Sequence, residues 1–218
     1  MGTPDRLDKL RNDFLINHRP QKKQLSEQQP CVFWDRDGTL CEYIPHLTKP
    51  SDFKIKSGAA EVLKKLNQAG VLNIVVTNQP MIAKGLMTTE DLELIHRKLE
   101  TNLGQQHAWL DEIYYCPHHP DKGFAGEVAE LKINCECRKP KLGLFNQAIT
   151  EFNIDKKKSL VVGDSLRDQK AAHDLDVPFI AVLGGESAES EFSECIFKSS
   201  SLSEISVFID HFFKDNRK

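Results

Sequence analysis

The chain has 218 residues, with 29 Lys and Arg against 32 Asp and Glu, so its formal net charge is only −3. A chain of this length can bury a proper core and suits one domain. The near-neutral balance, without a dense Lys/Arg block, argues against tight binding to nucleic acid or to an anionic membrane. No apolar run approaches the roughly 20 residues that cross a bilayer. We therefore expect a cytoplasmic protein with a small-molecule substrate.

The first 29 residues are polar and offer little for a core to bury. A short helix is conceivable over residues 6–16. Such a composition is typical of a surface segment. We expect residues 1–29 to be a polar N-terminal arm and residues 30–218 to form the domain.

From Cys31 onward, short apolar runs alternate with amphipathic segments. The expected strands cover 31–34, 72–76, 112–115, 159–162 and 178–183, and the expected helices cover 58–69, 89–103, 142–152, 166–175 and about 202–214. Strands that alternate with helices predict an α/β fold in which helices cover both faces of a parallel sheet. Residues 116–139 contain Pro and Gly without periodicity, so they are predicted to be an inserted loop. Residues 184–201 are acidic and Ser-rich, and no element is assigned there.

Carboxylates follow two of the expected strands. Asp35 and Asp37 come directly after the first strand, and their alternation with Arg36 lets both point toward one site. Ligands of parallel sheets bind at this edge, and a divalent cation would offset the repulsion between the two charges. By itself this segment could equally be an Asp-Gly turn. Thr77 after the second strand and Asp164 after a later one make that explanation improbable, because together they supply a metal cage and phosphate-oxygen donors.

The inserted loop holds two close groups of metal-ligand residues. Cys116-Pro117-His118-His119-Pro120 comes first and Cys135-Glu136-Cys137 follows. Two such pairs across a loop are typical of a structural zinc site, here Cys116, His118, Cys135 and Cys137, with His119 as a possible substitute for His118. Buried thiols or a disulfide are the alternatives, but neither explains a His between two prolines. A metal here would fix Arg138 and Lys139, which follow at once.

The order of these motifs resembles the HAD-like (haloacid dehalogenase-like) phosphotransferase superfamily over about residues 31–184. The motifs are Asp-x-Asp-Gly-Thr at 35–39, Thr77, Arg138-Lys139-Pro140, and Gly163-Asp164 with Asp168. The resemblance implies a Rossmann-like fold with a minimal cap and a magnesium-dependent phosphatase activity. It also implies that Asp35 attacks phosphorus to give an aspartyl-phosphate, while Asp37 is the general acid and base.

The same resemblance assigns the remaining roles. Mg²⁺ would be held by Asp35, the backbone carbonyl of Asp37 and Asp164, with Asp168 in an outer layer. Thr77 would donate a hydrogen bond to a phosphoryl oxygen, and Lys139 would neutralise charge on the phosphoryl group and on the nucleophile.

Within the superfamily, Cys-x-His followed by Cys-x-Cys-Arg-Lys-Pro is similar to the D-glycero-D-manno-heptose 1,7-bisphosphate 7-phosphatases and the histidinol-phosphate phosphatases. Thr77-Asn78-Gln79 resembles the heptose enzymes more closely, and the resemblance implies that Arg36, Asn78, Gln79 and Arg138 contact the sugar phosphate. Histidinol phosphate or another small metabolite is the alternative substrate. A nucleic-acid 3′-phosphatase and a non-catalytic binding module are more remote.

The chain departs from the heptose pattern at three places: residues 43–46, Pro80-Met81, and Ser165, where a Lys often follows Gly-Asp. None of these is a predicted phosphoryl-transfer residue. We therefore expect the reaction type to be kept and the substrate pocket to be altered. A small insert and a minimal cap also predict a monomer.

Overall fold

The structure, a computed structural model, describes residue 23 and residues 26–215. Within these residues one sheet contains β1 (Cys31–Trp34), β2 (Leu72–Asn78), β3 (Glu112–Cys116), β4 (Leu160–Gly163), β5 (Phe179–Val182) and β6 (Phe197–Ser199). The strand order is β3-β2-β1-β4-β5-β6, and each neighbouring pair is parallel. The predicted parallel α/β sheet is confirmed.

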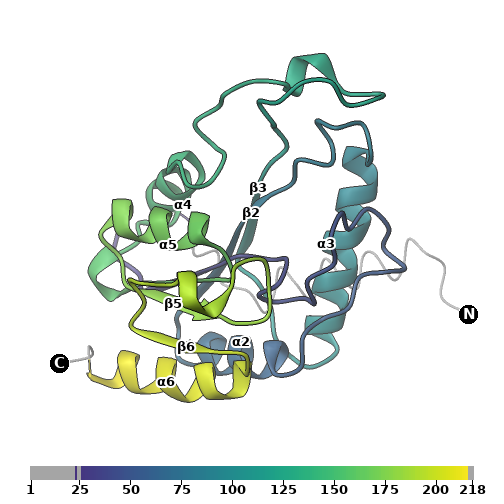
Figure 1. Cartoon of the computed structure of the whole chain (residues 1–218). Coiled ribbons are helices and arrows are strands. Elements are labelled where there is room, and N and C mark those ends of the chain that lie inside the picture. The colour runs from purple at the N-terminus through teal and green to yellow at the C-terminus, as the bar shows by residue number, and fades with distance from the viewer. Residues whose placement is uncertain (1–22, 24–25, 216–218) are drawn as a thin grey trace, which may run out of the picture.

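Helices cover both faces of this sheet. The helices α2 (Ala59–Gln68), α3 (Thr89–Gly104) and α6 (Leu202–Asp215) pack on one face, and α4 (Gly143–Phe152) and α5 (Leu166–Leu175) pack on the other (Figure 1). Successive side chains of a strand point to opposite faces, so Val32 and Trp34 of β1 enter one core while Cys31 and Phe33 enter the other. A strand buried on both faces reads as a continuous apolar run, as β1 does.

Among the described residues the predicted helices and strands are all present, whereas the helix expected over residues 6–16 lies outside them. The strand β6 lies in the stretch to which no element was assigned. This edge strand has only three residues, and Lys198 at its centre is exposed. Backbone hydrogen bonds hold β6 against β5. Ile196 N donates to Phe179 O, and Leu183 N donates to Ser199 O. With three residues, of which only Ser199 is buried, the strand is too short to show an apolar run or an alternating pattern.

Most of the expected N-terminal arm lies outside the described residues. At its end, Gln29 is buried and bonds with Phe152, Asn153 and Asp155 after α4. The chain is therefore fixed to the domain from Gln29 onward.

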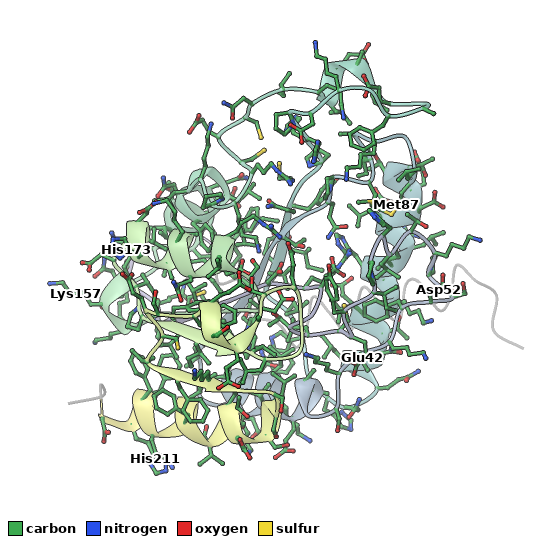
Figure 2. The ribbon with its side chains drawn as sticks, viewed as in Figure 1. Glu42, Asp52, Met87, Lys157, His173 and His211 are labelled. Carbon is green, nitrogen blue, oxygen red and sulfur yellow. The ribbon has the colours of Figure 1, made fainter. Side chains whose placement is uncertain are left out.

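The inserted loop projects beyond the carboxyl ends of β2 and β3 and carries a short 3-10 helix, η1 (Ala129–Leu131), at the top of Figure 1. Met87, labelled in Figure 2, lies at the same end of the molecule, just before α3 begins. His173 and His211 lie on the outer helices away from this end (Figure 2). Across the described residues, we find no helix with the length and apolarity needed to cross a bilayer.

Candidate active site and metal sites

Three carboxylates meet at the carboxyl ends of β1 and β4. Oxygens of Asp35, Asp164 and Asp168 lie within 4.8 Å of one another. The backbone N–H of Asp35 donates to Val162 O at 2.9 Å, which fixes the nucleophile candidate between the two strands. Gly38 has φ +76°, and a Cβ atom there would lie 2.0 Å from Asp164 Oδ2. Only glycine therefore lets the turn after β1 approach the Asp164 carboxylate so closely.

Lys139 reaches this cluster from the inserted loop. Its buried Nζ lies 2.8 Å from Asp35 Oδ1 and 2.7 Å from Asp168 Oδ1, and it donates to Val76 O. The side chain of Asn78 holds the Lys139 backbone, accepting from its N–H at 3.0 Å and donating to its carbonyl at 3.1 Å. The end of β2 therefore positions the cation that touches the predicted nucleophile.

Burial and mutual repulsion raise the pKa values of two of these carboxylates, Asp35 and Asp164. Burial raises the pKa of Asp35 to about 6; the Lys139 charge lowers it, while Asp168 and Asp37 add to the rise. Burial and the charges of Asp35 and Asp168 raise the pKa of Asp164 to about 8. Such a group of buried carboxylates favours binding of a divalent cation, which would offset their repulsion. Oxygen ligands of this kind suit Mg²⁺.

Asp37 is held by Arg36 and Gln79. Arg36 donates through Nε and Nη2 to Asp37 Oδ1 and through Nη2 to Oδ2 at 2.8 Å, while Gln79 Nε2 donates to Oδ2 at 2.9 Å. Burial raises the pKa of Asp37, but the Arg36 charge and these hydrogen bonds outweigh it, so the pKa is lowered.

The position of Arg36 corrects one prediction. Arg36 was predicted to contact substrate, but its side chain is fully buried and does not line the pocket. It bonds to Asp37 and Gln79 instead. These hydrogen bonds hold the Asp37 carboxylate in place.

A cavity of about 240 Å³ opens over these residues. The predicted residues that line it are Asp35, Asp37, Thr77, Asn78, Gln79, Arg138 and Lys139. Residues that were not predicted as site residues also line it, among them Tyr43, Met81, Lys84, His119, Arg167 and Glu186. The departures at 43–46 and Pro80-Met81 were the signal for part of this wall, and they meet where His46 Nδ1 lies 3.2 Å from Met81 Sδ.

Ser165, the third departure, belongs to the cap of α5. Its hydroxyl donates to Asp168 Oδ2 at 2.7 Å, and its backbone N–H donates to the same oxygen. Asp168 Oδ1 contacts Lys139, so both carboxylate oxygens of Asp168 have partners within the protein. This arrangement leaves Asp35 and Asp164 as the carboxylates best placed to bind a metal directly.

The four predicted zinc ligands form one compact cluster. Cys137 Sγ lies 3.1 Å from Cys116 Sγ, 3.2 Å from Cys135 Sγ and 3.1 Å from His118 Nδ1. Bonds of about 2.3 Å to a tetrahedral zinc would place sulfur ligands about 3.8 Å apart, so a bound ion would move these sulfurs apart by several tenths of an ångström. The alternative ligand, His119, lies beside Phe124 and lines the pocket. Arg138 Nη1 donates to His118 O, which joins the cluster to the pocket wall.

His96 on α3 predicts an acid sensitivity of folding. Its Nε2 is buried without a hydrogen-bond partner in the described structure, and burial, then the Arg36 charge, lowers the pKa of His96 from 6.5 to about 3. Below about pH 6.5 His96 binds a proton in the unfolded chain but stays neutral in the folded chain. The free energy of unfolding therefore falls as the pH is lowered toward 3. We expect this group to lower the free energy of unfolding by about 1–2 kcal/mol between neutral pH and about pH 5.

Urea unfolding at both pH values of the wild type and of His96→Phe measures this effect. The matched control is His211→Phe, which removes an exposed histidine (Figure 2). The pH dependence should be weaker in His96→Phe and unchanged in the control. Equal dependence in wild type and His96→Phe would contradict the assignment.

Known proteins resemble both the sequence and the fold. The profile of the HAD-hydrolase-like family matches residues 136–201. The D-glycero-beta-D-manno-heptose-1,7-bisphosphate 7-phosphatase of Yersinia pestis is 37% identical over 148 residues, covering 68% of this chain and 77% of that protein. The enzyme of the same name from Haemophilus ducreyi is 40% identical over 147 residues, covering 67% and 78%. A crystal structure of D,D-heptose 1,7-bisphosphate phosphatase from B. bronchiseptica, complexed with magnesium and phosphate, has a TM-score of 0.73 and 26% identity and covers 84% of this chain and 99% of that chain.

Proposed function

This chain belongs to the HAD-like family of D-glycero-beta-D-manno-heptose-1,7-bisphosphate 7-phosphatases, and from that premise we propose that it hydrolyses the 7-phosphate of the heptose 1,7-bisphosphate. The observation that carries the proposal is the contact of Lys139 Nζ with Asp35 at 2.8 Å, two residues that line the pocket, with buried Asp164 beside Asp35. We infer that one phosphate can meet all three groups there, with Asp35 as the nucleophile, Lys139 as the cation and Asp164 as a metal-binding carboxylate.

In the proposed reaction, an oxygen of Asp35 forms a bond to phosphorus while the bond from phosphorus to the sugar oxygen breaks. Asp37 gives its proton to the leaving oxygen. It then accepts a proton from the water that attacks phosphorus, while the bond from phosphorus to the Asp35 oxygen breaks and inorganic phosphate leaves. The negative charge of an arriving phosphate raises the pKa of Asp37, which favours the protonated form that the first step needs. Arg36 and Gln79 hold the Asp37 carboxylate in place through both steps.

We propose that Asp35, Asp164 and the backbone carbonyl of Asp37 hold Mg²⁺, while Asp168 orients Lys139. The presence of magnesium in the related crystal structure supports this assignment, as does the pairing of both Asp168 oxygens within the protein. When bound, the ion would offset charge on Asp35 and on the phosphoryl oxygens. Thr77, which lines the pocket, would donate a hydrogen bond to a phosphoryl oxygen.

We also propose that Cys116, His118, Cys135 and Cys137 hold a structural zinc. Four protein ligands leave no open position for a substrate, so such an ion would support the loop and take no part in the reaction. Reduced thiolate ligands suit a cytoplasmic protein.

We propose a monomer, for which gel filtration should give a mass near 24.8 kDa.

Phosphate release with magnesium tests the substrate. The panel contains both anomers of the heptose 1,7-bisphosphate, histidinol phosphate, other sugar phosphates and a 3′-phosphorylated oligonucleotide. We expect the highest kcat/KM on one heptose bisphosphate, loss of activity with a chelator, and recovery when Mg²⁺ returns. A higher kcat/KM on histidinol phosphate or on the oligonucleotide would overturn the substrate, and full activity in chelator would overturn the magnesium requirement.

A further inference from the structure

Two cations on the pocket wall have no carboxylate partner among residues 26–215. Lys139 is paired with Asp35 and Asp168, and Arg167 is paired with Glu186. Lys84 and Arg138 also line the pocket, yet neither forms an ion pair with any described residue. A cavity with two uncompensated positive charges beside the reaction centre favours a ligand with additional negative charge.

Phe124 of the inserted loop holds the Lys84 side chain. Lys84 Nζ lies 4.8 Å from the centre of the Phe124 ring, and Lys132 Nζ lies 4.4 Å from it. An ammonium group within about 6 Å of an aromatic ring is attracted by the negative face of the ring. The ring therefore limits the positions that a flexible lysine side chain can take.

The backbone of the loop is itself fixed around Phe124. The carboxylate of Glu127 accepts hydrogen bonds from the N–H groups of Gly123 and Phe124, at 2.9 and 3.0 Å. Lys132, whose side chain is buried, lies 3.5 Å from the same carboxylate. Phe124 is thus anchored at its backbone, although 36% of the residue is exposed.

The loop also docks directly on the segment that carries Lys84. Val128 N donates to Ala83 O at 3.1 Å. Gly85 has φ +70°, and a Cβ atom there would lie 1.8 Å from Gly126 O, so the two backbones are in contact on either side of Lys84. The geometry couples the loop to the orientation of one pocket cation.

We propose that Lys84 is a specificity-determining residue that binds, with Arg138, the phosphate group of the substrate that is not transferred, and that Phe124 is the positioning residue for Lys84. This inference rests on the proposed function, because the heptose bisphosphate supplies a second phosphate. Lys139, Thr77 and the metal serve the transferred phosphate, which leaves Lys84 and Arg138 for the other. Two cations from different segments match the charge of one phosphate group.

Comparing Lys84→Met with the wild type on heptose 1,7-bisphosphate and on heptose 7-phosphate tests the subsite. We expect KM for the bisphosphate to rise about ten- to a hundredfold with kcat little changed, because a charged hydrogen-bond partner is lost. The rise in KM should be much smaller on the monophosphate, which lacks the second phosphate. The matched control is Lys122→Met, an exposed lysine of the same loop that does not line the pocket. Equal losses on both substrates would overturn the role of Lys84 in specificity.

Phe124→Ala should raise KM for the bisphosphate in the same direction, and Phe124→Tyr, which keeps the ring, should restore it. A loss in Phe124→Ala that Phe124→Tyr fails to restore would overturn the positioning role.

Calorimetry on Asp35→Asn protein separates this inference from the proposed function. The Asp35→Asn protein should bind fructose 1,6-bisphosphate more tightly than fructose 6-phosphate. Adding Lys84→Met to the same protein should remove this difference in affinity. Equal binding would overturn the subsite even in an active enzyme, whereas wild type that releases no phosphate would overturn the proposed function alone.

Discussion

Replacing Asp35 with Asn is expected to abolish phosphate release and leave the protein folded. The amide keeps the shape of the carboxylate but cannot form the aspartyl-phosphate, so kcat should fall at least about 10⁴-fold. Burial is the main reason why the pKa of Asp35 rises from 3.8 to about 6. Because the folded state holds the charged form less well than the unfolded state does, the ionised carboxylate lowers stability above about pH 6. A neutral amide removes that effect.

Thermal unfolding without added metal, at about pH 7.5, should therefore give a melting temperature for Asp35→Asn that is equal to or above that of the wild type. Phosphate release by the two proteins is compared with that of Asp52→Asn, which alters an exposed carboxylate (labelled in Figure 2) that does not line the pocket. Substantial activity in Asp35→Asn would exclude Asp35 as the nucleophile. Inactivity with a collapsed melting temperature would show instead that the carboxylate supports the fold.

The four central strands of the sheet, β2, β1, β4 and β5, could be predicted because they are buried on both faces. Such strands, like β1, are short apolar runs, and their helices carry a clear apolar side, so periodicity alone located them. Parallel strands end at one edge of a sheet, so Asp35, Thr77 and Asp164 could also be predicted to lie close together. The structure places Thr77, Asp35 and Asp37 in one pocket, with Asp164 beside Asp35.

The substrate wall could not be predicted in the same way. The family resemblance implied that Arg36 contacts the sugar phosphate, but tertiary packing buries it against Asp37. Lys84 and Phe124 are 40 positions apart in the numbering, and only the docking of the inserted loop brings them together. The inserted loop has no hydrophobic periodicity, so the sequence pattern could not predict these contacts.

Replacing Cys137 with Ser is expected to disable the enzyme through its loop. Cys137 lies 3.1–3.2 Å from each of the other three ligand atoms, so its loss removes a shared contact of the whole cluster. Arg138 and Lys139 follow directly, and Lys139 N must stay 3.0 Å from Asn78 Oδ1 for Nζ to reach Asp35. We expect kcat/KM to fall about 100-fold or more and the melting temperature to drop, because metal binding at such a site contributes to folding.

Metal content supplies a measurement that does not depend on activity. Wild type should contain about one zinc per chain by elemental analysis, and Cys137→Ser should contain much less. Cys195→Ser is the matched control, since Cys195 is a free cysteine outside the cluster and should keep both zinc and activity. A zinc-free wild type with full activity would rule out the structural ion. If Cys137→Ser instead loses its zinc but keeps its kcat/KM, the sheet and the Asn78 contacts alone must position Lys139, and the loop would serve only the substrate wall around Lys84.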